Sequence, residues 1–165
     1  MAVIGVIAMF ATFLTSSQGG QVALIPFTIF TICMSILVAI GCLSYDVQVI
    51  IQSAVITTAA TAVCIGYIWI TKRDLHSLHG ILSCGLTILI IWGITISIFQ
   101  PSDKIQILYS IIGIIIFVTY ILVDTSDMVN GRYKDDEYLI AAMSLYLDII
   151  NLFLYVLDLL NKCKK

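Results

Sequence analysis

The stretch "YLIAAMSLYLDIINLFLYVLDLL", residues 138–160, is apolar enough to enter a membrane, yet it carries Asp148 near its middle. About 20 consecutive apolar residues match the hydrocarbon core of a bilayer. An Asp at the centre of a membrane helix costs about 2.5–3.5 kcal/mol on insertion scales. Acids in such segments therefore usually face protein or a water-filled cavity, which makes them candidates for function.

Asp148 belongs to a row of polar residues with helical spacing. Asn151, Tyr155 and Asp158 follow it at steps of three, four and three residues. In a helix this spacing places all four side chains on one face. Such a face must point toward protein or water rather than lipid. We therefore expect other helices to surround this segment.

The composition indicates that the whole chain is a membrane protein. It is 61% hydrophobic and 11% charged, with a mean hydropathy of +1.10, whereas soluble domains have about 25% charged residues. The pattern predicts a single all-α domain over residues 1–165, a polytopic transmembrane helical bundle. Its six apolar segments lie at about 2–16, 22–44, 47–71, 80–100, 105–129 and 138–160.

Several classes of function and site are disfavoured by the residues present. The net charge of -2, with no basic stripe carrying interleaved aromatics, argues against nucleic acid as a partner. The five cysteines lack metal-ligand spacing, so we expect no zinc or redox pair. His76 and His79 share a connection with Lys72 and Arg73, where we expect contact with lipid headgroups rather than a metal site.

The basic residues bear on how the last segment sits in the membrane. If all six segments cross, the Lys and Arg residues divide four against four between the two faces. If the last segment returns to the face it entered from, seven lie on one face and only Lys104 on the other. Because Lys and Arg are in excess on the cytoplasmic side, we expect a last segment that is central within the protein or re-entrant. The C-terminal tail is then cytosolic.

Asp124 is the second acid inside an apolar segment. Tyr120 lies four residues before it and Asp127 three residues after it, so the three share a helix face. The 130–137 connection folds the two acidic segments onto each other, and the rise per residue leaves Asp124 and Asp148 offset by about 6 Å, one helical turn. A pair is permitted but not required: Asp124 can instead cap a helix end in headgroup water, with Asp148 satisfied by its neighbours.

A pair of carboxyl groups at this position would respond to pH. Ionising both carboxyl groups in a low dielectric is energetically costly, so the pair would share a proton near neutral pH. While protonated, the two acids would hold each other and close a path through the protein. When deprotonated, they would repel each other, open the path and attract a cation. Calcium suits hard oxygen ligands but takes 6–8 of them in a tight site. Asp124, Asp148 and Asn151 therefore predict only a weak, transient calcium site, and no other cofactor.

Three stretches carry a resemblance to a known family. "YILVDTSDM", "DEYLIAAMSLYLDIINLFLYVL" and "SYDVQVIIQSAVITTAATAV" resemble the Bax-inhibitor motif (lifeguard) family of transmembrane proteins, most closely its Golgi anti-apoptotic branch, over about residues 22–162. The resemblance implies a seven-helix fold, residence in Golgi or endoplasmic reticulum membranes, suppression of apoptosis, and a pH-sensitive leak of stored calcium. It assigns the family's paired aspartates to Asp124 and Asp148.

The sequence also departs from that family pattern. Members usually begin with a cytosolic tail and another helix, and segment 2–16 matches their second helix in shortened form, which leads us to expect a truncated viral member. An early arginine holds the aspartates in some relatives, but no Lys or Arg precedes Lys72 here. The gate would then depend on Asp124 and Asp148 without that partner.

Two other functions remain open at this stage. The chain can act as a non-conducting membrane protein that binds death regulators or related channels, with lipid as its solvent. Two intramembrane acids also suggest an aspartyl protease, whose motifs resemble "YD" and "GxGD". Here the acids sit in "LVD" and "LYLD" without those glycines, so we expect no enzyme. The sequence sets no oligomeric state.

Overall fold

The computed structural model describes residues 20–133 and 138–164. The apolar segment expected at 2–16 lies outside these residues. The described part of the chain is all-helical and contains no strand, which confirms the predicted fold class. Its helices are α2 (Gly20–Cys42), α3 (Val47–Thr71), the 3₁₀ turn η1 (His76–Leu78), α4 (His79–Phe99), α5 (Asp103–Val129) and α6 (Tyr138–Lys164).

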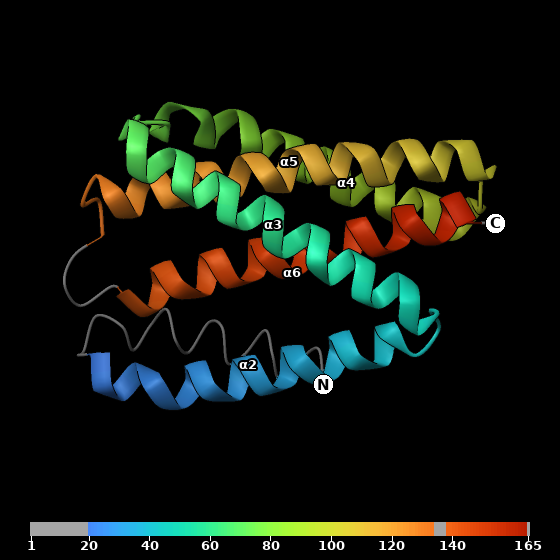
Figure 1. The fold of residues 1–165 in the computed structure, drawn as a ribbon, viewed down its shortest axis with the longest axis horizontal. Helices are drawn as coiled ribbons and strands as arrows, with labels where there is room; N and C mark the ends of the chain where they lie inside the picture. The colour runs from blue at the N-terminus through green and yellow to red at the C-terminus, as the bar shows by residue number, and fades with distance from the viewer. Residues whose placement is uncertain (1–19, 134–137, 165) are drawn as a thin grey trace.

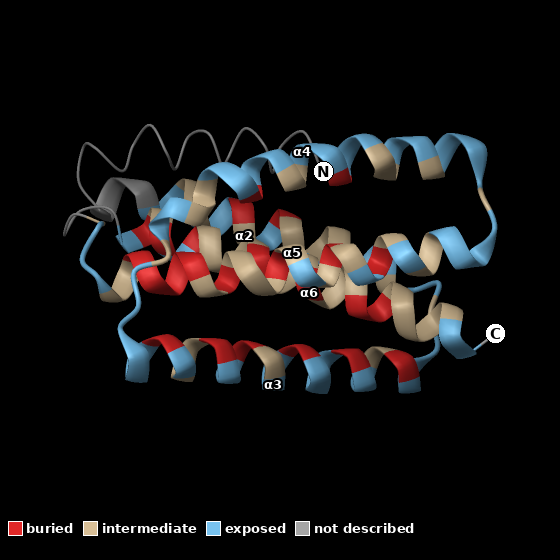
Figure 2. Ribbon diagram, turned by 90° about the horizontal axis from the view of Figure 1, so that it is seen from above, coloured by how far each residue is buried: buried red, intermediate tan, exposed pale blue. Residues whose placement is uncertain are grey.

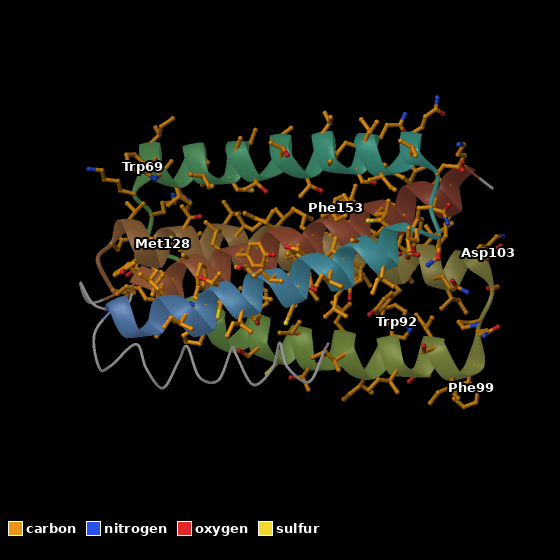
Figure 3. The ribbon with its side chains drawn as sticks, turned by 90° about the horizontal axis from the view of Figure 1, so that it is seen from below. Trp69, Trp92, Phe99, Asp103, Met128 and Phe153 are labelled. Atoms are coloured by element: carbon orange, nitrogen blue, oxygen red, sulfur yellow. The ribbon has the colours of Figure 1, made fainter. Side chains whose placement is uncertain are left out.

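Five helices of the described part are long and apolar enough to cross a membrane. They lie roughly side by side along one long axis (Figure 1). Two ends follow from this arrangement. The His76 end holds the 72–75 connection, η1, the end of α5 and the start of α6; the Lys164 end holds the 43–46 and 100–102 connections and the end of α6. Figure 3 shows Trp69 and Met128 at the first end and Phe99 and Asp103 at the second.

Each helix ends where the local sequence stops favouring it. Lys72 and Gln100 adopt left-handed backbone angles, with φ of 49° and 43°, and terminate α3 and α4. Pro101 follows Gln100 directly, and a proline in this position cannot continue a helix. Gly131 follows α5 with φ of 66°, a conformation that glycine adopts without steric cost. The short connections therefore hold neighbouring helices antiparallel.

The last helix, α6, is central in the bundle. It packs against α5, α3 and α2, and Figure 1 shows it between α2 and the α3–α5 side of the molecule. It is one uninterrupted helix of 27 residues that runs from the His76 end to the Lys164 end. The central form of the prediction is thus correct, and the re-entrant form is wrong. Because α6 runs the full length, the basic residues among those described divide evenly between the two ends: Lys72, Arg73 and Arg132 at one, and Lys104, Lys162 and Lys164 at the other.

The buried side chains lie where the helices face one another. Figure 2 shows α3 with buried residues along one side and exposed residues along the other, and α4 largely exposed. The main core cluster includes Phe117, Ile121, Leu152 and Val156 from α5 and α6. The exposed apolar side chains face outward, where lipid is the solvent that suits them. Residues 123–127 of α5 are all buried, and this turn positions the polar site.

A buried acid pair in the membrane domain

Asp124 and Asp148 meet between α5 and α6. Asp124 is 2% exposed and Asp148 is 6% exposed, and their carboxyl groups form a side-chain hydrogen bond. The hydroxyl of Ser144 also donates to Oδ2 of Asp124. Ser144 and Asp148 lie one turn apart on α6, so the Asp124 carboxyl group bridges that turn. The offset of one helical turn that the sequence left open is closed in the structure.

The hydrogen bond between the two acids has a chemical consequence. An ionised carboxylate only accepts hydrogen bonds, so a bond between two carboxyl groups requires a proton on one of them. Among the described residues, Oδ2 of Asp148 is buried without a hydrogen-bond partner. Leaving a charged oxygen buried and unpaired is costly. The arrangement in the structure therefore suits a pair that carries one shared proton.

Tyr120 lies beside this pair, as its helical spacing predicted. Its hydroxyl group is hydrogen-bonded to Ser83 of α4 and lies close enough to Asp124 and Asp148 for a Coulombic interaction with both. The phenol thus connects α4 to the acid pair. Three helices, α4, α5 and α6, therefore meet at the acids.

A cavity of about 430 Å³ opens next to the pair. Its polar lining comes from Tyr109 and Tyr120 of α5 and from one face of α6: Ser144, Asp148, Asn151 and Tyr155. The opposite wall is apolar and comes from α4. A second cavity of about 330 Å³ continues toward the Lys164 end, where Asp158 and Lys162 join its lining. The polar stripe read from the sequence thus lines two neighbouring cavities.

Tyr155 lines both cavities, as do Tyr109 and Asn151. Its hydroxyl is 2.8 Å from that of Tyr109, and its ring stacks on Phe117 with the centroids 5.6 Å apart. Gly113 of α5 lies directly beneath the ring, since a Cβ there would be 2.4 Å from Cδ1 of Tyr155. These contacts hold the ring of Tyr155 in place against α5.

The other predicted polar residues have separate partners. Asn151 donates to the carbonyl of Leu147 at 2.8 Å. Asp158 accepts a hydrogen bond from Ser110 at 2.5 Å and is paired with Lys162. Asp158 is therefore neutralised locally, near the Lys164 end, and is not part of the acid pair.

Asp127 is not part of the acid pair either, although it follows Asp124 by one turn. It is 4% exposed and interacts with His76, His79 and Arg132. Sequence reasoning placed both histidines among lipid headgroups and did not connect them with Asp127. The structure instead brings these three residues together in a second polar cluster at the His76 end.

Calcium is the cation that the sequence suggested for the acids. Two carboxyl groups with the Ser144 hydroxyl and the Tyr120 phenol offer fewer oxygens than the 6–8 that calcium takes. This set does not form a closed calcium site.

The fold and these buried acids define a polytopic helical membrane protein with ionisable groups at the centre of its bundle. The chain belongs to the family described as "Inhibitor of apoptosis-promoting Bax1", whose model matches residues 1–165. This match confirms the resemblance stated from the closing segments.

Curated relatives come from viruses, animals and plants. The chain is 36% identical over 136 residues to the Golgi anti-apoptotic protein of Vaccinia virus (strain Lister), covering 82% of this chain and 56% of the relative. It is 35% identical over 136 residues to Protein lifeguard 4 of Mus musculus, with the same coverage of each. It is 37% identical over 135 residues to Protein LIFEGUARD 4 of Arabidopsis thaliana, covering 79% and 54%. The chain spans about half the length of these relatives.

Proposed function

We propose that this protein suppresses apoptosis from an intracellular membrane and lowers stored calcium through a pH-sensitive leak path. The anti-apoptotic role is supported by family membership and by the similarity to the viral Golgi anti-apoptotic protein. The observation that carries the leak path is the hydrogen-bonded pair of Asp124 and Asp148 beside a polar cavity. The proposal assigns no catalytic step to the acids.

The pair would act as the gate. While one proton is shared, Asp124 and Asp148 hold α5 and α6 together at the inner end of the cavity. Loss of that proton places two negative charges side by side in a poorly solvated site, where they repel each other strongly. The helices would separate locally, and the exposed carboxylates would attract a cation.

The cavities would supply the rest of the route. From Asp148 the polar face of α6 leads past Asn151 and Tyr155 to Asp158. We place the second constriction at Tyr155, because its ring lines both cavities. A path of this kind has ionisable groups at its ends and an aromatic ring at its middle.

Calcium flux from liposomes tests the gate. The full chain is reconstituted, and release is measured with an indicator dye from about pH 6 to about pH 8, the range over which a shared proton near neutrality is lost. Wild type should leak more as the pH rises. Asp148→Asn should leak little at every pH, because the amide donates to Asp124 without an exchangeable proton. Asp103→Asn, an exposed acid on the same helix as Asp124, is the matched control and should behave as wild type.

The results separate the leak from the alternative function. Equal, pH-independent flux from wild type and Asp148→Asn at matched protein content would refute the gate. Absence of flux from wild type at every pH, with suppression of cell death retained in cells, would favour a non-conducting protein that binds death regulators or related channels.

Residence in the Golgi or endoplasmic reticulum, with a cytosolic C-terminal tail, is part of the same proposal. The basic residues do not decide the orientation once α6 runs the length of the bundle. Cys163 is exposed at the Lys164 end and gives a direct test. In cells whose plasma membrane is permeabilised and whose organelle membranes are intact, a membrane-impermeant maleimide should label Cys163. Cys163→Ser should abolish that labelling. Labelling only after organelle membranes are dissolved would place the tail in the lumen.

A further inference from the structure

The cluster of His76, His79 and Asp127 lies apart from the acid pair, at the His76 end. Each residue offers one donor atom, and the three atoms lie within 4.8 Å of one another. Oδ2 of Asp127 is 2.8 Å from Nε2 of His79 and 3.2 Å from Nδ1 of His76. Both imidazoles therefore point at the same carboxylate oxygen, from η1 and from the first residue of α4.

Hydrogen bonds from Ser126 hold the 72–75 connection next to the cluster in place. The hydroxyl of Ser126, the residue before Asp127, donates to the carbonyl of Arg73 at 2.9 Å and accepts from the backbone N–H of Leu75 at 3.0 Å. Ser126 is fully buried. This side chain thus fastens the connection that carries the histidines to the end of α5. The backbone that carries the histidines is therefore fixed relative to Asp127.

Arg132 orients the carboxylate of Asp127. Its Nε lies 3.2 Å from Oδ1 of Asp127, an oxygen that is also 3.2 Å from Nδ1 of His76. Oδ2 is the oxygen that both histidines contact. The guanidinium also binds Asp74 at 2.5 Å, so two carboxylates balance its charge. Partners that fix the unused atom of a metal ligand are a regular part of metal sites and contribute to their affinity.

We propose that His76, His79 and Asp127 form a binding site for a divalent transition-metal ion of the zinc class. Two imidazole nitrogens and one carboxylate oxygen are ligands that zinc binds in proteins, and three protein ligands leave a fourth position for water. Bonds of about 2.0–2.2 Å in a tetrahedron separate the ligand atoms by roughly 3.3 Å. The two N–O separations here, 2.8 and 3.2 Å, are close to this value, and the two nitrogens lie within 4.8 Å of each other.

The burial of the three residues also suits an ion that enters from water. The side chains of His76 and His79 are 52% and 35% exposed, whereas that of Asp127 is 6% exposed. The histidines face the aqueous end of the bundle and the carboxylate forms the floor. Calcium and magnesium prefer oxygen ligands, so the two nitrogens favour a transition metal over the calcium of the proposed leak path.

A bound ion would join η1 and α4 to the last turn of α5. Asp127 lies three residues after Asp124, a rise of about 4.5 Å along the helix. The site is therefore close to the acid pair but shares no ligand with it. Metal binding and calcium flux can fail independently, which keeps this proposal separate from the leak path.

Zinc binding to the purified full chain tests the site. Titration calorimetry in detergent at about pH 7.5, where neutral imidazole is the ligand form, should give one Zn²⁺ per chain and much weaker binding of Ca²⁺. Co²⁺ should give the intense visible absorption of a tetrahedral ion. Because thiols also bind zinc, the measurements use a Cys84→Ser, Cys163→Ser background, which removes the exposed cysteines.

The variants decide whether these residues are the ligands. His79→Gln and Asp127→Asn should each weaken zinc binding at least tenfold, since even second-shell changes cost about 10–100-fold. Asp103→Asn and Asp148→Asn should bind as the background does. Circular dichroism checks the fold of each variant, and His76→Gln replaces any that loses helix. Unchanged binding in the ligand variants, tighter binding of calcium than of zinc, or no zinc binding by the background protein would overturn the proposal.

Discussion

Gly113 gives the sharpest test of how closely α5 and α6 pack. A Cβ at this position would lie 2.4, 2.5 and 2.7 Å from three ring atoms of Tyr155. Ordinary contacts between carbon atoms are about 3.5–4.0 Å, so Gly113→Ala requires the ring to move by about 1 Å. The ring has little freedom to move, because it stacks on Phe117 and its hydroxyl is hydrogen-bonded to that of Tyr109.

The cost follows from the contacts that the movement disturbs. Overpacking a close interface typically costs 1–3 kcal/mol, and loss of the Tyr109–Tyr155 hydrogen bond adds about 0.5–1.5 kcal/mol. The better helix propensity of alanine returns roughly 0.5–1 kcal/mol. We therefore expect Gly113→Ala to lower the free energy of unfolding by about 0.5–4 kcal/mol, the net of these terms.

Gly66 of α3 is the matched control, since a Cβ there would meet nothing within 4 Å. Gly66→Ala should leave the protein as stable as wild type or raise its stability by up to about 1 kcal/mol. Unfolding in mixed detergent and SDS micelles measures both variants. The fluorescence of Trp92, whose ring centroid is 5.5 Å from that of Tyr109, reports on the affected region. Equal stability of the two alanine variants would refute the packing described for Tyr155.

Two further predictions concern the polar contacts at either end of α6. Ser144→Ala should lower the free energy of unfolding by about 1–3 kcal/mol, because it leaves a buried oxygen of Asp124 without its donor. Ser144→Thr keeps a hydroxyl group and should retain most of the stability. Equal losses in the two variants would show that the hydrogen bond from this hydroxyl does not stabilise the fold. At the Lys164 end, the hydrogen bond from Lys164 at 2.8 Å, with its positive charge, lowers the pKa of Asp46 below its ordinary 3.8. This exposed pair therefore stabilises the fold slightly above about pH 4 and ceases to do so as the pH falls through the lowered pKa. The melting temperature of wild type should exceed that of Asp46→Asn by a small margin at about pH 6, and a margin that grew in acid would contradict the sign.

The polar face of α6 was predictable because it depends on one helix alone. An Asp in an apolar segment must face protein, and the steps from Asp148 to Asp158 identify the face. The same periodicity, extended one turn toward the N-terminus, reaches Ser144, so the missing donor to Asp124 could have been found in "SLYLD". The pairing of the two acids could not be predicted from the periodicity of one helix, because it depends on how far α5 and α6 are shifted along each other.

Contacts between segments that are distant in the chain could not be predicted from the periodicity of the sequence. His76 and His79 are separated from Asp127 by 51 and 48 residues, and no periodicity links them. The re-entrant prediction failed for a different reason. The charge rule concerns basic residues in loops beside the membrane, whereas Lys162 lies within the last turn of α6 and is paired with Asp158.

The consecutive burial of residues 123–127 limits how this turn can vary in evolution. At about 100° per residue, five successive side chains point in every direction around the helix. Asp124 faces α6, Thr125 lines a pocket with Trp69 of α3, and Asp127 faces η1 and α4. A helix in lipid normally has an outer face that tolerates almost any apolar residue, but this turn has none. A saturation mutagenesis scan should therefore show an unbroken block of intolerant positions here, in place of the usual alternation of tolerant and intolerant ones.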